Sequence, residues 1–451
     1  MMFLRTLKSH IGGNVAMMVA LTIPVILMLV GGALDFSRMV ALRIEMQDAA
    51  DVASLGAVAV NSKAYKIGQT MGSGEIKEGS TQALSIYQAN IRPHAELKNT
   101  TVSAKVMKTG TVLNSTVTTT GLYKPYILGL FGFNNLPVNA TAKSIATLPP
   151  YIDFYLLLDN TPSMGLGATY DDITKMINAT ANVSNTNERR CAFACHETEG
   201  NAGKDYYTLA RSKAVNATLR IDVVREATQD LMTTAQTTRT QDNQYRMAIY
   251  DFGADAKTVP QADPPAYKVS DLTTDLAKSS DDAKNKIALM TVPYQNYKMD
   301  QQTNFNSVLS YMNNSVIGNP GNGMSTVTPQ KVLFFVSDGM SDGYTCDKNG
   351  TNCKRKLGGL DPAYCQAIKD RGIRIAVLYT TYLRLVGAYA PTDSWYKNNV
   401  DKYIAPTNQV TANMQACASP GLFFEVAPDK GISEAMTALF YRVLTVVRID
   451  Q

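Results

Sequence analysis

The strongest pattern along the chain is an uninterrupted apolar run near its start. Val15 to Leu34 is twenty residues without a charge, which as a helix would be about 30 Å long and would match the hydrocarbon thickness of a bilayer. Arg5 and Lys8 precede the run, and no acidic residue lies among the first 34 residues. The positive-inside rule then predicts a single-pass membrane helix over 15–34, with residues 1–14 in the cytoplasm and the remainder outside.

Two processing alternatives remain open for this segment. Gly31-Gly32-Ala33 could be cut as a small-residue signal-peptide site, although a signal peptide would have a shorter apolar core. Gly12-Gly13 is similar to the end of a prepilin leader, but prepilins usually carry Glu at the fifth position after the cut, where this chain has Met17 or Met18. The length of the apolar run favours a retained anchor.

The region 35–148 is predicted to form a helical stalk followed by a small sheet. Helix-forming residues continue without Pro to about Ser62, and Ala49, Ala53 and Ala57 recur every four residues. This small-residue stripe would suit either close approach of another helix or packing on its own domain. A polar helix is expected near Ser80–Ile91. Three alternating Val- and Thr-rich segments then predict an antiparallel sheet: Val102–Met107, Val112–Thr118 and Val138–Ala146.

After Leu148-Pro149-Pro150, which marks a domain boundary, strand and helix patterns alternate. Such alternation predicts an α/β fold with a parallel sheet. The expected strands are Ile152–Leu158, Tyr245–Phe252, Lys331–Ser337, Arg374–Thr380 and Leu422–Val426. The expected helices are Leu209–Gln236, Phe305–Met312, Ala363–Arg371 and Ile432–Val446.

Composition narrows the possible functions. The 451 residues suffice for about two or three domains. The formal charge of +5 is spread along the chain without clusters of Lys and Arg, which argues against a nucleic-acid surface. No Ser-His-Asp set, HExxH motif or poised carboxylate pair emerges, so we expect a protein that is not an enzyme and has no small-molecule substrate.

The cysteines point to an oxidising compartment. All six follow Tyr151, on the outer side of the predicted membrane helix. The sequence does not fix their connectivity, and the preferred pairs are Cys191–Cys195, Cys346–Cys353 and Cys365–Cys417. Cys191 to His196 approaches a c-type haem motif, but three residues rather than two separate the cysteines. A small disulfide-closed loop is the preferred interpretation, with haem or zinc as alternatives.

Oxygen-bearing side chains gather at predicted strand ends. Asp159, Thr161 and Ser163 follow the first strand of the α/β region, Thr303 precedes a helix, and Asp338 follows a third strand. The carboxyl ends of parallel strands meet at one edge of a sheet. Hard divalent cations prefer oxygen ligands. The pattern therefore predicts a site for Mg²⁺, with Mn²⁺ or Ca²⁺ as alternatives.

These residues resemble the metal-ion-dependent adhesion site of von Willebrand factor type A domains. The resemblance covers about 151–450, with an insertion near 166–208, and implies a Rossmann-like type A fold. It assigns Asp159, Thr161 and Ser163 to the first metal loop, Thr303 to the second and Asp338 to the third. Thr161 stands where the family more often has Ser. The implied chemistry is capture of a partner protein's carboxylate by a metal ion that lacks one ligand.

The segment Gly13–Ala59 resembles the N-terminal region of TadE/TadG-like Flp pilus-assembly proteins. The residues that carry this resemblance are Ala20 to Pro24, Gly32 to Arg38 and Gln47 to Ala53. Coupled to a type A domain, they match the TadG-type architecture. This implies a component of tight-adherence pilus assembly in the bacterial inner membrane, with its C-terminal domain in the periplasm and partners in the pilus machinery.

Two other functions remain open at this stage. A surface-displayed adhesin would bind host or neighbouring cells directly. The co-subunit of an ATP-driven chelatase or chaperone complex would place its type A domain in the cytoplasm.

Overall fold

The computed structural model divides the chain into two compact units, residues 1–148 and 149–451. The structure describes residues 12–184, 189–194, 196–197, 205–241, 243–252, 265–292, 303–346, 353–382, 384–389, 396–427 and 431–449. The change of unit falls at Leu148 and Pro149, where the chain enters the Pro pair.

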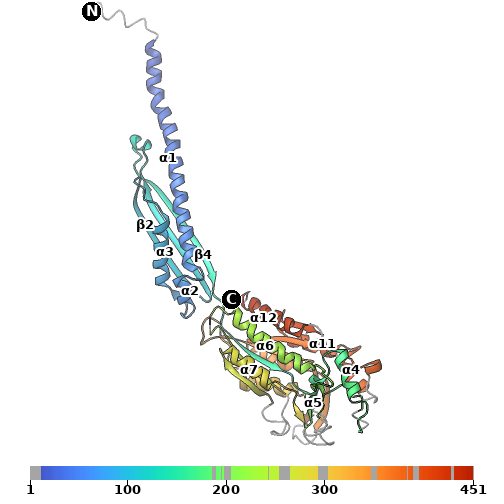
Figure 1. The fold of residues 1–451 in the computed structure, drawn as a ribbon. Helices are drawn as coiled ribbons and strands as arrows, with labels where there is room; N and C mark the ends of the chain where they lie inside the picture. Colours follow the sequence, from blue (N-terminus) through green and yellow to red (C-terminus); the bar gives the residue numbers. More distant parts are fainter. Residues whose placement is uncertain are drawn as a thin grey trace, which may run out of the picture. The chain divides into compact units, whose positions relative to one another are not determined.

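The N-terminal unit combines one long helix with a four-stranded antiparallel sheet in the order β1-β2-β3-β4. Its elements are α1 (Gly12–Val58), α2 (Lys63–Gly68), β1 (Gly74–Glu75), α3 (Lys77–Asn90), β2 (Leu97–Thr109), β3 (Val112–Tyr123), η2 (Leu128–Phe131) and β4 (Leu136–Thr147). The C-terminal half of α1 packs along the sheet, whereas its N-terminal half extends beyond it (Figure 1). Of the described helices, α1 is long and apolar enough to cross a membrane.

The small-residue stripe of α1 packs inside its own unit. Ala49, Ala53 and Ala57 are buried in a core with side chains from α3 and the sheet. A Cβ at Gly56 would lie 2.9 Å from the Ile86 side chain of α3. Since the two helices can approach closely only where side chains are small, the stripe provides the contact of α1 with α3 inside the same unit.

The C-terminal unit is built on a six-stranded sheet in the order β14-β13-β10-β5-β7-β8, parallel throughout except for the antiparallel pair β7–β8. Its strands are β5 (Ile152–Leu158), β7 (Tyr245–Asp251), β8 (Tyr267–Thr273), β10 (Gln330–Ser337), β13 (Arg374–Thr380) and β14 (Phe423–Val426). Two small sheets add β6 (His196–Glu197) with β9 (Thr291–Val292), and β11 (Met340–Cys346) with β12 (Cys353–Gly359).

Helices cover both faces of this sheet, as the predicted Rossmann-like α/β fold requires. They are α4 (Tyr170–Ala179), α5 (Tyr206–Ala210), α6 (Arg220–Thr238), α7 (Leu276–Lys286), α8 (Phe305–Tyr311), α9 (Pro362–Asp370), α10 (Lys402–Ile404), α11 (Gln409–Cys417) and α12 (Ile432–Ile449). Short 3₁₀ or π turns are η3 (Pro162–Gly165), η7 (Met312–Val316), η8 (Gly387–Tyr389) and η9 (Lys397–Asp401). One face packs on α6, α7 and α12 (Figure 1), and the other on α8, α9 and α11.

The largely apolar sequence of β5, in which Asp153 is the one charged residue, follows from this double cover. Phe154 and Leu156 point into the core on the α6 and α12 side, whereas Tyr155 and Leu157 point into the opposite core. Every residue of β5 is buried. A strand buried on both faces loses the alternation of polar and apolar residues and becomes a continuous apolar run.

One predicted helix is wrong in its extent. The expected helix Leu209–Gln236 is two helices, α5 and α6, separated by a turn in which Asn216 adopts φ 47°. The Asp222 carboxylate accepts a hydrogen bond from the Leu219 amide at 3.1 Å and closes the start of α6. The sequence prediction also missed β8, α7 and the β11–β12 hairpin.

Candidate functional site

The two carboxylates predicted to bind metal meet at the carboxyl edge of the central sheet. Asp159 follows β5, and Asp338 follows β10. These strands are parallel neighbours, with Leu158 opposite Val336. Both carboxylates are fully buried. Register alone therefore brings together two acidic residues that lie far apart in the sequence.

The first loop arranges its hydroxyls around Asp159. The Oδ1 atom of Asp159 accepts hydrogen bonds from the Thr161 amide at 3.0 Å and from the Thr161 hydroxyl at 2.6 Å. The Ser163 hydroxyl lies 3.4 Å from the Thr161 hydroxyl. Thr161 is fully buried, whereas Ser163, in η3, is partly exposed. The cluster thus reaches solvent on the Ser163 side.

Thr303 is held at the same edge by a different connection. Its backbone exchanges two 2.9 Å hydrogen bonds with Asp342 in β11, the strand that begins just after Asp338. Asn304 follows and caps α8 through the Ser307 amide. Within the described residues, the Thr303 hydroxyl makes no hydrogen bond to the other four predicted ligands. The structure therefore joins four of the five in one network and holds the fifth nearby through β11.

A buried arginine completes the site. Arg220, the first residue of α6, is fully buried and donates from Nη1 to Asp338 Oδ2 at 3.2 Å and from Nη2 to the Thr381 carbonyl at 2.9 Å. Its guanidinium lies over the Tyr382 ring, 5.1 Å from the centroid. Its Nε atom has no hydrogen-bond partner among the described residues. The site thus holds two carboxylates and one fixed positive charge.

Burial and mutual repulsion dominate the electrostatics. Burial and, after it, repulsion from the neighbouring Asp338 carboxylate raise the pKa of Asp159 to about 7, against the lowering effect of hydrogen bonds from Ser337 and Thr161. Burial also raises the pKa of Asp338, which Arg220 and then Ser163 oppose. Additional positive charge close to the two carboxylates would favour their charged forms.

The donor set fits a hard divalent cation. All five predicted ligands offer oxygen, and the two like-charged carboxylates have more negative charge than Arg220 balances. Across the described part of the chain, no group of three or more His, Cys, Asp or Glu could hold a metal ion. In the predicted site hydroxyls would supply three of the five ligands, and such an all-oxygen set suits Mg²⁺ better than softer transition metals.

The raised pKa of Asp159 predicts a pH-dependent stability. The Asp159 carboxyl binds its proton more tightly in the folded state than in the unfolded chain. Its contribution to the free energy of unfolding is therefore complete below about pH 4 and is lost as the pH rises to about 7. Denaturant unfolding in the presence of a chelator should therefore show a free energy of unfolding that falls across this interval. In the Asp159→Asn variant, which cannot ionise here, the fall should be smaller. An equal fall in both proteins would contradict the assignment.

Sequence reasoning missed three groups at this edge. Ser337 donates to Asp159 Oδ2 at 2.6 Å and accepts from the Gly339 amide. Asp251, at the end of β7, is buried and has a pKa raised well above its usual value by desolvation. Position at a strand end could have pointed to both of these residues. Nothing in the sequence singles out Arg220, because its contact depends on how α6 docks against the sheet.

The structure joins Cys365 and Cys417 by a disulfide, linking α9 to the end of α11. Cys346 and Cys353 are opposite each other in the β11–β12 hairpin, although their side chains are outside the described residues. The Cys191–Cys195 prediction falls partly outside them as well, because Cys195 is not described.

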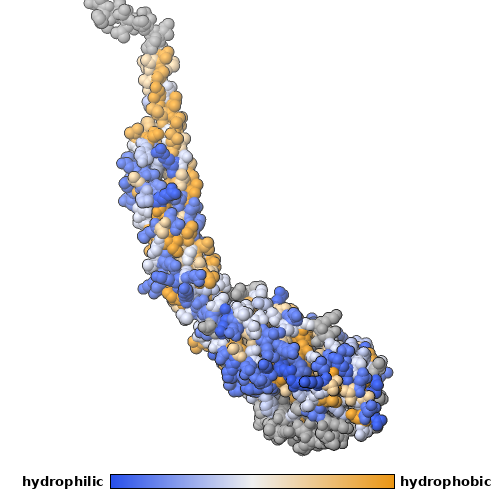
Figure 2. Space-filling view, viewed as in Figure 1, coloured by the Kyte–Doolittle hydropathy of each residue, from blue (hydrophilic) through white to orange (hydrophobic). Residues whose placement is uncertain are grey.

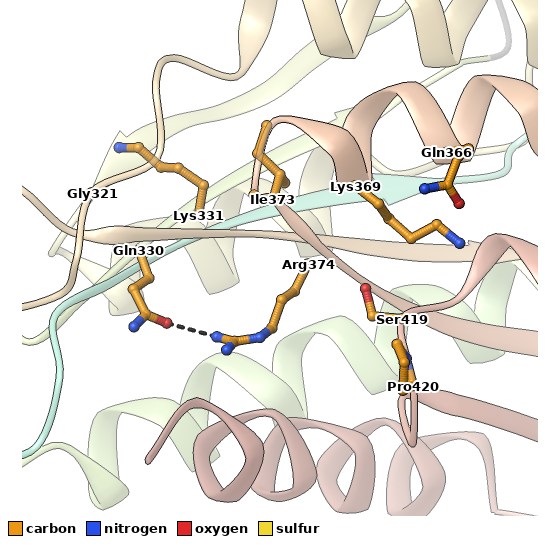
Figure 3. A pocket seen from close by; sticks show the side chains of 10 residues that line it. Gly321, Gln330, Lys331, Gln366, Lys369, Ile373, Arg374, Ser419 and Pro420 are labelled. Carbon is orange, nitrogen blue, oxygen red and sulfur yellow. Dashed lines mark hydrogen bonds between the residues drawn. The ribbon is translucent and has the colours of Figure 1, made fainter. Parts of the chain in front are cut away.

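A pocket of about 590 Å³ opens at the opposite end of the strands. Figure 3 shows Lys331, Lys369 and Arg374 among its lining residues, with Arg374 hydrogen-bonded to Gln330. Lys331 pairs with the buried Asp153, and Lys369 donates to the Ala416 carbonyl at 2.9 Å. Its cations already have partners in the protein, so the carboxyl edge remains the better candidate for binding.

Comparisons with solved structures give only distant likenesses. The pilus adhesin SpaC from Lactobacillus rhamnosus GG superposes with a TM-score of 0.34 at 10% identity, covering 79% of this chain and 35% of that one. The von Willebrand factor domain of the type V pilus tip protein Mfa5 from Porphyromonas gingivalis gives 0.33 at 10% identity, covering 67% and 97%. The PilB minor pilin from Streptococcus sanguinis gives 0.33 at 12%, covering 78% and 80%.

This chain therefore spans about a third of the length of SpaC, and TM-scores this low carry no information on ligands or partners. No curated protein matches the sequence. The family comparison is more specific, because residues 13–60 match the model of the Tad family, described as Flp pilus-assembly TadE/G-like. The N-terminal part of this chain thus carries the TadE/G-like region of Flp pilus-assembly proteins.

Proposed function

We propose that this chain is a membrane-anchored component of Flp pilus assembly that binds a protein partner through a divalent cation. The observation that carries the proposal is the buried pair Asp159 and Asp338, surrounded by hydroxyls and reaching solvent beside Ser163. The TadE/G-like region at 13–60 supports the cellular context. On this proposal the chain is a binding protein rather than an enzyme.

Five residues would hold the cation: Asp159, Thr161, Ser163, Thr303 and Asp338. The bound cation would lack one ligand, and its positive charge would allow it to accept a carboxylate from the partner. The protein's own groups fix the donors in place. Ser337 orients one oxygen of Asp159 and Thr161 the other, while Arg220 holds Asp338 against the sheet edge.

The proposed location is the bacterial inner membrane, with α1 as a single span, the N-terminus in the cytoplasm and the C-terminal unit in the periplasm. Arg5 and Lys8 before the apolar run support this orientation. The Cys365–Cys417 disulfide supports an oxidising compartment for the C-terminal unit.

The Asp159→Ala variant tests the metal mechanism. Full-length protein should retain partners from solubilised envelope in Mg²⁺ and release them in a chelator, and the variant should lose the Mg²⁺-dependent fraction. The variant should remain folded, because Asp338 keeps Arg220 and is relieved of a neighbouring negative charge. Calorimetry with Mg²⁺, Mn²⁺ and Ca²⁺ on the same proteins measures metal uptake directly.

Asp271→Ala is the matched control, since this carboxylate belongs to the same unit and is 70% exposed. It should bind partners and metal as the unchanged chain does. Metal-dependent capture that survives Asp159→Ala would reject the proposed site, whereas normal metal uptake without partner capture would reject only the adhesion role.

A further inference from the structure

The loop between β3 and β4 lies against α1 at the end of its apolar run. It contains η2 and is bounded by Tyr126 and Phe133. In Figure 1 it is the cyan tip of the sheet, on the side of the free N-terminal half of α1. It contacts α1 at Gly31, Gly32, Asp35 and Arg38. These contacts fix the position of the loop along the axis of α1.

Asp35 anchors the loop. Its buried carboxylate accepts hydrogen bonds from the amides of Tyr126, Ile127 and Leu128 at 3.0, 2.8 and 2.8 Å, and from the Tyr123 hydroxyl at 3.3 Å. Three consecutive backbone donors on one carboxylate hold both the position and the direction of the loop. Charge-assisted bonds of this kind are among the strongest that a protein makes.

Gly31 makes this approach possible. A Cβ at this position would lie 2.1 Å from Ile127 Cγ2, which no side chain could accommodate without moving the loop. A Cβ at Gly32 would lie 3.4 Å from Leu128, in ordinary contact. The loop is thus seated on the last turn of the apolar run and not merely close to it.

Several apolar side chains of this loop are exposed. Leu130 is 83% exposed, Tyr126 57% and Phe133 51%, and Phe36 on α1 is 60% exposed. Figure 2 shows that apolar surface also runs along the N-terminal half of α1. Exposed aromatic and aliphatic side chains close together in one loop mark an interaction surface.

The position of the loop along α1 indicates what its exposed apolar side chains would contact. The run Val15–Leu34 would span the hydrocarbon layer, about 30 Å thick, so Asp35 lies at its boundary. Aromatic rings concentrate at that boundary because they join an apolar face to a polar edge. Arg38 lies just beyond, 5.2 Å over the Tyr126 ring, and Lys124 is exposed at the base of the loop. Both cations stand where lipid phosphates would lie.

We infer that the loop Tyr126–Phe133 inserts into the interface of the lipid leaflet from which α1 emerges. The tilt of a membrane helix and its rotation about its own axis are set by flanking anchors and by contacts with neighbouring elements. A single helix without such contacts is therefore free to tilt and rotate. A second contact to the same leaflet, held rigidly to α1 by Asp35, restricts both. The N-terminal unit then stands on the membrane at two points.

The test uses the full-length chain in phosphatidylcholine vesicles, with and without bromine on the acyl chains close to the carbonyl. Trp395 is the only tryptophan and is replaced by Phe, so that a single new tryptophan reports lipid contact. Leu130→Trp probes the loop, and Met28→Trp within the apolar run is the positive control. Ile145→Trp is the matched control, because Ile145 is 69% exposed on the same sheet but about 30 Å along β4 from Leu136.

Brominated lipid should quench the tryptophans at 130 and 28 and leave the one at 145 unquenched. Emission from position 130 should also lie at shorter wavelength than emission from 145. Quenching at 28 without quenching at 130 would overturn the inference. Short-wavelength emission at 130 without lipid quenching would overturn it in favour of a protein partner, such as a second copy. Absence of quenching at both 28 and 130 would contradict both the inference and the proposed membrane anchor.

Discussion

The Arg220→Met variant should lose about 3–5 kcal/mol of unfolding free energy when metal is chelated, the range expected when one partner of a buried ion pair is removed. Asp338 would remain fully buried beside Asp159 with no guanidinium to balance it. The same change should raise the affinity for Mg²⁺, because a fixed cation 3.2 Å from a predicted ligand would no longer repel the ion. Added Mg²⁺ should therefore restore much of the lost stability.

Denaturant unfolding with and without Mg²⁺, followed by circular dichroism, measures both effects. Arg246→Met is a matched control, because it also removes an arginine from a buried aspartate of the central sheet. Asp153 keeps Lys331 as a partner after that change, so the loss should be smaller and the response to Mg²⁺ unaltered. If Arg220→Met left Mg²⁺ affinity unchanged, Arg220 would have no part in a metal site.

Replacing Cys365 and Cys417 together by Ala should lower the free energy of unfolding by about 4 kcal/mol, the loop-entropy value for a separation of this size. The bond spans 52 residues and ties α9 to the end of α11. Both cysteines are fully buried, so packing adds to the effect. Unfolding midpoints of the oxidised protein and the double variant give the difference.

A reducing agent present throughout unfolding should lower the midpoint of the unchanged protein more than that of the double variant, because only the unchanged protein has the Cys365–Cys417 bond to lose. Equal midpoints for the oxidised protein and the double variant would mean that this bond does not stabilise the fold.

Part of the candidate site could be predicted because its residues follow strands that the sequence marks clearly. Asp159 and Asp338 each follow a largely apolar strand, and parallel strands place such ends at one edge. Arg220 could not be predicted. It lies in a stretch that the sequence presents as one helix, and its charge matters only because α6 begins at the sheet edge.

The small-residue stripe of α1 shows the same difference. Its spacing indicated a close contact but not the partner, which is α3 of the same unit. The loop at Tyr126–Phe133 gave no signal in the sequence, because its exposure and its position against Asp35 arise from the fold of the β3–β4 connection.

The sequence by itself determined the long apolar run, the antiparallel sheet of the N-terminal unit and the α/β order of the C-terminal unit. These depend on local periodicity and on residues close together in the chain, which any window of sequence displays. Only the tertiary structure decided that Arg220 faces Asp338, that Ser337 holds Asp159, and that Asp35 holds a distant loop. Those contacts join residues from separate elements, and their geometry is set by packing rather than by any local pattern.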